Sequence, residues 1–149
     1  MSEQRGFEDL ECYQLALRVF KEAYRIANSL PPDEKYNLGT QIRRAATSTI
    51  LNLAEGYGRY HYLDSLRFYY TARGSLSEVL SAFIACDEAG YTTAELSRQR
   101  ELCYAALRSL NGFIRYVRKQ QQGHHEYGDH FVREESVRYH VNDILSKDD

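Results

Sequence analysis

The sequence predicts an all-α protein, an antiparallel up-down-up-down four-helix bundle followed by a flexible C-terminal tail. Apolar residues recur at three- and four-residue steps over long stretches, as they do on the buried face of a helix. The only two prolines of the 149 residues are adjacent, Pro31 and Pro32, which leaves the remaining chain free to form long helices. We expect the bundle to span residues 1–123 and an acidic tail that contains histidines to span residues 124–149.

The first predicted helix covers residues 8–29. It carries two interleaved apolar stripes, which indicates a wide buried face against two neighbouring helices, and Pro31-Pro32 ends it. The second predicted helix covers residues 36–54 and ends at Gly56. Its apolar stripe is formed by Ile42, Ala46, Ile50 and Leu53.

The third predicted helix begins at Asp64, a candidate N-cap, and runs to Gly90. The fourth begins after Thr93, a second candidate cap, and runs to Gly123 with apolar residues in nearly heptad order. Gly74 interrupts the third helix, where a glycine is less favourable than alanine by roughly 1 kcal/mol. We therefore expect a close backbone approach to the second helix at this position.

A second face of the second helix is polar and lacks any apolar residue. Short polar side chains on it favour a contact surface over a solvated one, since they add little to helix propensity. We interpret the face as a structural network in which Glu78 reaches Arg43 or Arg44 in a partly buried ion pair; direct binding of a ligand or nucleic acid by either arginine is the alternative. The network residues are Arg43, Arg44, Ser48, Asn52, Glu55 and Glu78.

Residues 41–56, QIRRAATSTILNLAEG, resemble a signature of the four-helix-bundle proteins encoded by intervening sequences of large-subunit (23S) ribosomal RNA genes. The similarity extends to residues 7–16 and 30–36, and to the Ala72-Arg73-Gly74-Ser75 segment with Glu78. Relatives of this family include the accessory variability (Avd) proteins of diversity-generating retroelements, which form five-membered barrels. The resemblance implies a homopentamer, with a reverse transcriptase and structured RNA or an RNA-DNA duplex as candidate partners.

Composition places further limits on function. The three cysteines are far apart and include no C-x-x-C, which favours neither a disulfide framework nor a zinc site. The N-terminal residues are charged, and no run approaches the roughly 20 apolar residues that cross a bilayer. We expect a soluble, cytoplasmic protein that has no membrane partner.

Charge is divided unevenly along the chain. Residues 1–120 hold 16 Lys and Arg against 14 Asp and Glu, whereas residues 121–149 hold 3 against 7. Sequence-independent nucleic-acid binding usually accompanies a strong basic excess. The nearly neutral balance of the body therefore lowers the expectation of a general nucleic-acid binder.

Two groups of residues remain candidates for a nucleic-acid or partner surface. Arginines and aromatic residues alternate from 57 to 73, a pattern that suits base stacking and phosphate contact but equally suits subunit packing. Basic residues on the fourth helix form a ridge, read either as a solvated face or as a surface for phosphates. The candidates are Arg59, Tyr60, Arg67, Arg108, Arg115 and Lys119.

No enzyme signature emerges from the sequence, which predicts no catalytic, cofactor-binding or metal-ligating residue. The histidines and acids of residues 124–130 lack regular ligand spacing. Arg133 and His140 have the spacing of certain helical ribonucleases, which makes a small ribonuclease a remote alternative. We interpret the protein as a non-enzymatic, self-assembling bundle that serves as a binding or accessory scaffold; a nucleic-acid-binding accessory protein of a reverse transcriptase is the main alternative.

Overall fold

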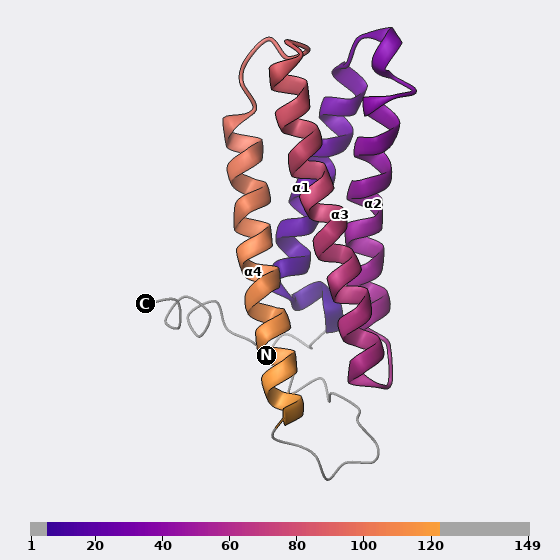
Figure 1. The fold of residues 1–149 in the computed structure, drawn as a ribbon, viewed down its shortest axis with the longest axis vertical. Helices are drawn as coiled ribbons and strands as arrows, with labels where there is room; N and C mark the ends of the chain where they lie inside the picture. Colours follow the sequence, from indigo (N-terminus) through magenta and orange to yellow (C-terminus); the bar gives the residue numbers. More distant parts are fainter. Residues whose placement is uncertain (1–5, 123–149) are drawn as a thin grey trace.

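The computed structural model describes residues 6–122, which form four α-helices and two short 3-10 turns (Figure 1). The predicted all-helical four-helix architecture is confirmed. In chain order the elements are η1 (Gly6–Asp9), α1 (Glu11–Ser29), η2 (Pro32–Glu34), α2 (Leu38–Tyr57), α3 (Tyr62–Glu88) and α4 (Ser97–Gln122).

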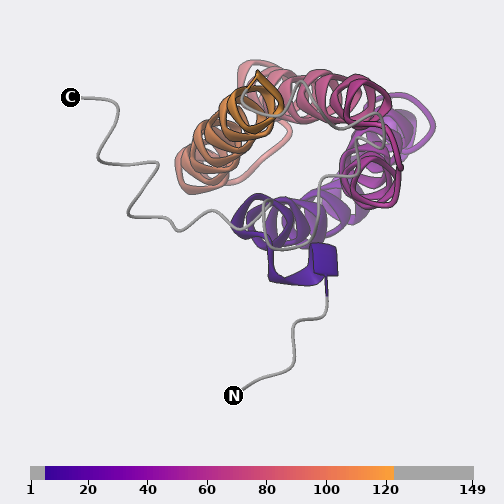
Figure 2. The same ribbon diagram turned by 90° about the horizontal axis from the view of Figure 1, so that it is seen from below.

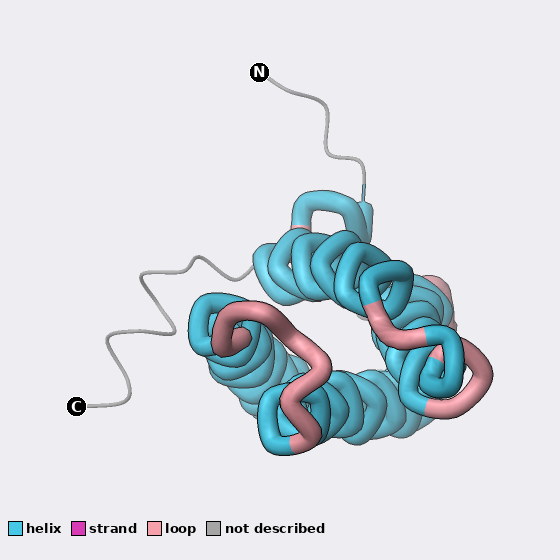
Figure 3. Tube along the Cα trace, turned by 90° about the horizontal axis from the view of Figure 1, so that it is seen from above, coloured by secondary structure: helices cyan, strands magenta, loops and turns pink. Residues whose placement is uncertain are grey.

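The four helices surround a common axis in chain order, as seen from either end of the bundle (Figures 2 and 3). Each helix packs on its neighbours in the chain, and α1 packs on α4 to close the circle. The connections between α1 and α2 and between α3 and α4 lie at one end, and the α2–α3 connection lies at the other (Figure 1). Successive helices therefore run in opposite directions. None of them is long and apolar enough to span a bilayer.

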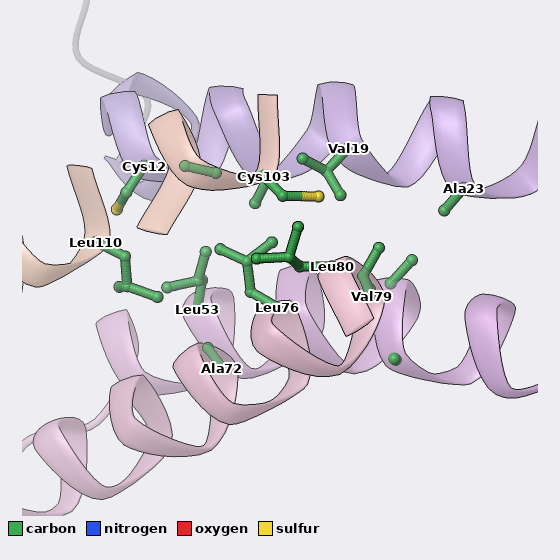
Figure 4. Packing of buried hydrophobic residues seen from close by; sticks show 14 of the residues in the cluster. Cys12, Val19, Ala23, Leu53, Ala72, Leu76, Val79, Leu80, Cys103 and Leu110 are labelled. Atoms are coloured by element: carbon green, nitrogen blue, oxygen red, sulfur yellow. The ribbon is translucent and has the colours of Figure 1, made fainter. Parts of the chain in front are cut away.

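Side chains from all four helices meet in one apolar core (Figure 4). Val19 of α1, Leu53 of α2, Leu76 of α3 and Leu110 of α4 are each at most 1% exposed. The three cysteines are buried free thiols in this core, and burial raises the pKa of Cys103 to about 12. The predicted apolar stripes thus face the bundle axis.

The two predicted N-caps are wrong. α3 begins at Tyr62, with His61 in the cap position, so Asp64 lies inside the first turn. α4 begins at Ser97 rather than after Thr93. The late start of α4 is explained by Asp87, at the end of α3. Its carboxylate accepts hydrogen bonds from the Leu96 N–H (2.9 Å) and the Thr92 hydroxyl (3.1 Å). These bonds hold the connecting segment as a loop.

Three other predicted helix boundaries shift. The segment before α1 forms the 3-10 turn η1 (Gly6–Asp9), so α1 starts three residues later than predicted. α2 starts at Leu38 and continues through Gly56 to Tyr57, with Gly58 as its C-cap. Gly56 is therefore an interior helical residue.

Tight packing of α3 against a glycine occurs at Gly56 of α2 and not at Gly74. A Cβ atom on Gly56 would lie 2.7 Å from Cε1 of Tyr69 and 3.0 Å from Cβ of Phe68. A Cβ atom on Gly74 would meet nothing within 4 Å, and Gly74 is exposed. The expected close contact at Gly74 is wrong. Inside the subunit, no such contact offsets the roughly 1 kcal/mol by which glycine in a helix is less favourable than alanine.

The two connections at the upper end of the bundle in Figure 1 are joined by a hydrogen bond. The Tyr91 hydroxyl donates to Oε1 of Glu34 over 2.9 Å, and the Asn37 side-chain amide donates to Oε2 over 3.0 Å. The bond from Tyr91 is the main reason that the pKa of Glu34 lies below its usual value. The same bond raises the pKa of Tyr91.

Candidate functional site

The polar face of α2 contacts α3 through short side chains. Oγ of Ser48 and Oγ of Ser75 lie 2.8 Å apart. The Asn52 amide donates to the Ser48 carbonyl oxygen (2.8 Å) and to Ser48 Oγ (3.0 Å). Since all three side chains are partly buried, these bonds satisfy polar groups between the helices. Ser48 and Asn52 thus lie in a network between α2 and α3.

The charged residues of the predicted network do not take part in these contacts between α2 and α3. Arg44 and Glu78 are both exposed, and within residues 6–122 neither a hydrogen bond nor an ion pair joins them. The predicted partly buried ion pair is therefore wrong, and the contact between the two helices is made by Ser48 and Ser75 instead. Arg43 turns to α1, where it donates to Oδ1 of Asn28 over 2.7 Å.

The arginines and aromatic residues around the α2–α3 connection gather into one cluster. The Arg59 guanidinium lies over the Phe68 ring, 4.6 Å from its centroid, and the Arg67 guanidinium lies 5.8 Å from the same centroid. Arg59 also forms an exposed ion pair with Glu55 (2.6 Å). Tyr60 is exposed beside this cluster. Arg59, Tyr60 and Arg67 therefore share one end of the bundle.

A second cluster lies along the outer seam between α3 and α4. The Arg73 guanidinium donates to Oδ1 of Asn111 over 3.2 Å and lies 5.1 Å from the ring centroid of Tyr70. Arg108 and Arg115 are three residues before and four residues after Asn111, which puts them on the same side of α4. The predicted residues Arg108 and Arg115 thus lie on the side of α4 that contacts Arg73 of α3.

Tyr70 and Arg73 belong to the segment in which arginines and aromatic residues alternate, but their place in this seam, and that of Tyr104, was not predicted. Tyr104 lies seven residues before Asn111 on α4 and is exposed. Its spacing from Asn111 and Arg115 is a signal of a shared face that could have been read from the sequence. The hydrogen bond between Arg73 and Asn111 could not be predicted from the sequence, because it depends on the register between α3 and α4.

The seam is cationic although the whole chain carries a net charge of −2. Residues 102–122 of α4 contain Arg108, Arg115, Arg118 and Lys119 and no acidic residue. The facing segment of α3, residues 65–77, adds Arg67 and Arg73 and contains no acidic residue, although Asp64 just before it forms an ion pair with Arg67 (3.7 Å). These parts of α3 and α4 lie toward the end where α2 turns into α3 (Figure 1). We refer to this surface as the α3–α4 basic seam.

A comparison with known protein families shows which family the chain belongs to. Residues 8–112 match the family model described as 23S rRNA-intervening sequence protein. The chain belongs to the 23S rRNA-intervening sequence protein family. No curated protein matches the chain. The match covers α1, α2 and α3 and the first part of α4, so the family resemblance read from the second helix is confirmed.

The family match ends at residue 112, before Arg115 and Lys119 of the basic seam. The candidate metal and ribonuclease residues also lie beyond it: the His124 to His130 cluster, Arg133 and His140 are outside the described residues. Within residues 6–122, no group of three or more His, Cys, Asp or Glu side chains is placed to hold a metal ion.

Proposed function

We propose that this 23S rRNA-intervening sequence protein is a non-enzymatic, self-assembling bundle that acts as a cytoplasmic binding or accessory scaffold. The supporting observation is the placement of four of the six large apolar side chains that are exposed among residues 6–122. Leu51 is 60% exposed, Leu63 66%, Tyr60 48% and Tyr70 38%. All four lie on α2, on α3 or on the connection between them.

Covering such side chains favours association. Full burial of one leucine side chain contributes about 1.5–3 kcal/mol. Four such residues within two adjacent helices and their connection are the feature that suggests an interaction surface. Two exposed leucines flanked by tyrosines on neighbouring helices therefore suit a protein contact.

We propose a closed ring of five subunits. A ring forms when one surface of each copy binds a different surface of the next copy and the rotation closes. The number five rests on the resemblance to the accessory variability proteins of diversity-generating retroelements.

Changing both leucines to lysine tests this assembly. We expect the Leu51→Lys, Leu63→Lys variant to elute as a monomer of 17.4 kDa in size-exclusion chromatography with light scattering, while its circular dichroism stays helical. The matched control is Tyr36→Lys, which changes a side chain that is 83% exposed in the α1–α2 connection and should leave assembly unchanged. If the double variant still assembled, Leu51 and Leu63 would not be the contact that drives assembly.

A second candidate function is supported by the α3–α4 basic seam. Arginines next to exposed Tyr104 offer phosphate contacts and a stacking surface for unpaired bases. Repetition of the seam around a ring would concentrate positive potential despite the low net charge of one subunit. The corresponding role is an accessory protein of a reverse transcriptase that binds structured RNA or an RNA-DNA duplex.

Salt dependence tests this second function. Because phosphate contacts release counterions, wild-type affinity for structured RNA should fall roughly 100- to 1,000-fold between about 50 mM and 200 mM salt for four to six contacts. An Arg108→Ala, Arg115→Ala, Lys119→Ala variant should lose about three units of the logarithmic salt slope. The measurement is filter binding.

The matched control removes the same amount of charge from α1. Arg18→Ala, Lys21→Ala, Arg25→Ala changes three exposed basic residues on that helix. Equal losses in the two triple variants would show that only net charge matters. Absence of RNA retention at the lower salt concentration would reject the second function.

A further inference from the structure

The α4 side of the α3–α4 basic seam is a single row of residues on one helix face. Its members follow one another at alternating steps of four and three residues, which is the spacing of neighbours along one side of an α-helix. The row consists of Tyr104, Arg108, Asn111, Arg115 and Arg118. Because Asn111 accepts the hydrogen bond from Arg73, the row runs along the edge of α4 that lies beside α3.

Three cations at this edge have no acidic partner within the bundle. Arg108, Arg118 and Lys119 are exposed, and none of the ion pairs within residues 6–122 includes them. Like charges one helical turn apart destabilise a helix. Acidic groups placed against this edge would relieve that repulsion. The edge therefore suits an anionic occupant.

Acidic groups are concentrated in the chain directly after α4. Residues 123–149 hold 3 Lys and Arg against 7 Asp and Glu, a net charge of −4 (3 − 7). The basic seam holds six cations in residues 65–77 and 102–122, two segments that contain no acidic residue. The charges of the C-terminal segment and of the seam are therefore opposite in sign and similar in size.

The C-terminal segment is long enough to reach the whole row. α4 ends at Gln122, at the end of the bundle where α2 turns into α3 (Figure 1). The row extends back from there to Tyr104, about 27 Å along the helix. Residues 123–149 can span at most roughly 90 Å. Covalent attachment also gives a binding segment an effective concentration that reaches the millimolar range for short linkers, which favours it over a free polyanion.

We propose that residues 123–149 dock on the α3–α4 basic seam of their own bundle and compete there with a nucleic acid. The carboxylates of the segment occupy the places of phosphates against Arg108, Arg118 and Lys119. The competition rests on the proposed nucleic-acid function, whose site it regulates, whereas the docking needs no nucleic acid. A chain with the segment docked binds RNA weakly, and loss of the carboxylates opens the seam.

Carbodiimide crosslinking of the full chain tests the docking without RNA. The reagent joins a lysine amine to a carboxylate in contact with it and takes up the water that the new amide bond releases. An Arg108→Lys variant keeps the charge of the row and places an amine within it. We expect mass spectrometry to find an amide between position 108 and a carboxylate of residues 123–149. Lys35, in the α1–α2 connection at the other end of the bundle, is the internal control and should form none.

Isotope labelling shows which copy supplies the carboxylate. An equal mixture of ¹⁵N-labelled and unlabelled protein is crosslinked, and the two peptides of each amide are weighed. We expect both peptides to carry the same label. Amides that join labelled to unlabelled peptides in the proportion of random pairing would overturn docking on the bundle of the same chain.

Removal of carboxylates from the segment tests the competition. The Asp129→Asn, Glu134→Gln, Glu135→Gln variant of the full chain should bind structured RNA at least about tenfold more tightly than wild type in filter binding at about 50 mM salt. The matched control is Asp33→Asn, Glu78→Gln, Glu88→Gln, which removes the same charge from exposed positions of the bundle. Since distant charges are screened, its gain should not exceed about twofold.

The outcomes separate this inference from the function on which it rests. An amide at position 108 and a tenfold gain confined to the C-terminal variant are the results that we expect. RNA binding by wild type without that amide would overturn the docking, and equal gains in the two triple variants would overturn the competition. An amide at position 108 in a protein that retains no RNA would support the docking and reject the nucleic-acid function.

Discussion

Phe113→Ala is expected to lower the free energy of unfolding by about 3–5 kcal/mol, the range for removing a buried aromatic ring from a core. Phe113 is 0% exposed, and its ring packs edge-to-face on Tyr69 with 4.9 Å between centroids. The substitution leaves a cavity between α3 and α4 and removes the aromatic pair. Urea denaturation at matched protein concentration measures the loss.

Phe20→Ala is the control for this change. Phe20 lies on α1 and is only partly buried, beside Tyr24 at 4.5 Å between ring centroids. Its loss should be clearly smaller because less apolar area leaves water on folding. Equal losses for the two variants would contradict the assignment of Phe113 to the centre of the core.

Gly56→Val is expected to destabilise the protein by about 3 kcal/mol, at the upper end of the cost of overpacking a core. The Cβ atom alone would come within 2.7 Å of the Tyr69 ring, and Tyr69 is only 2% exposed. Movement of the Tyr69 ring is opposed by Phe113, which packs against it from α4. The α2 and α3 helices would have to separate, which thermal denaturation should report as a lower Tm.

Gly58→Val is the matched control two residues away. A Cβ atom on Gly58 would meet its nearest neighbours at 3.7 Å, an ordinary contact, and the residue is exposed. We expect little change in Tm. A Gly56→Val protein as stable as Gly58→Val would show that α2 and α3 are not in tight contact at Gly56.

Helix type and buried faces were predictable because they depend on local spacing. The apolar residues of α1 and α3 repeat over many turns, and one face of such a helix has to be buried whichever neighbour covers it. Helix starts were less predictable. Asp64 and Thr93 have the chemistry of N-caps, but the start of α4 is set by Asp87, a residue of the preceding helix.

The candidate site was less predictable than the fold because it depends on the register between helices. In the sequence, Gly56 was read as a helix end and Gly74 as an interruption within a helix, and only the position of Tyr69 on α3 shows which glycine is covered. Likewise, Arg44 and Glu78 carry opposite charges, yet Ser48 and Ser75 occupy the contact between their helices. The sequence predicted the polar face of α2 but not which of its residues are buried.

The central claim, self-assembly of the bundle, is tested most directly by the molar mass of the wild-type protein. Light scattering at tens of micromolar protein gives that mass without reference to molecular shape. We predict five times the subunit mass of 17.4 kDa. A single species at the subunit mass would contradict self-assembly.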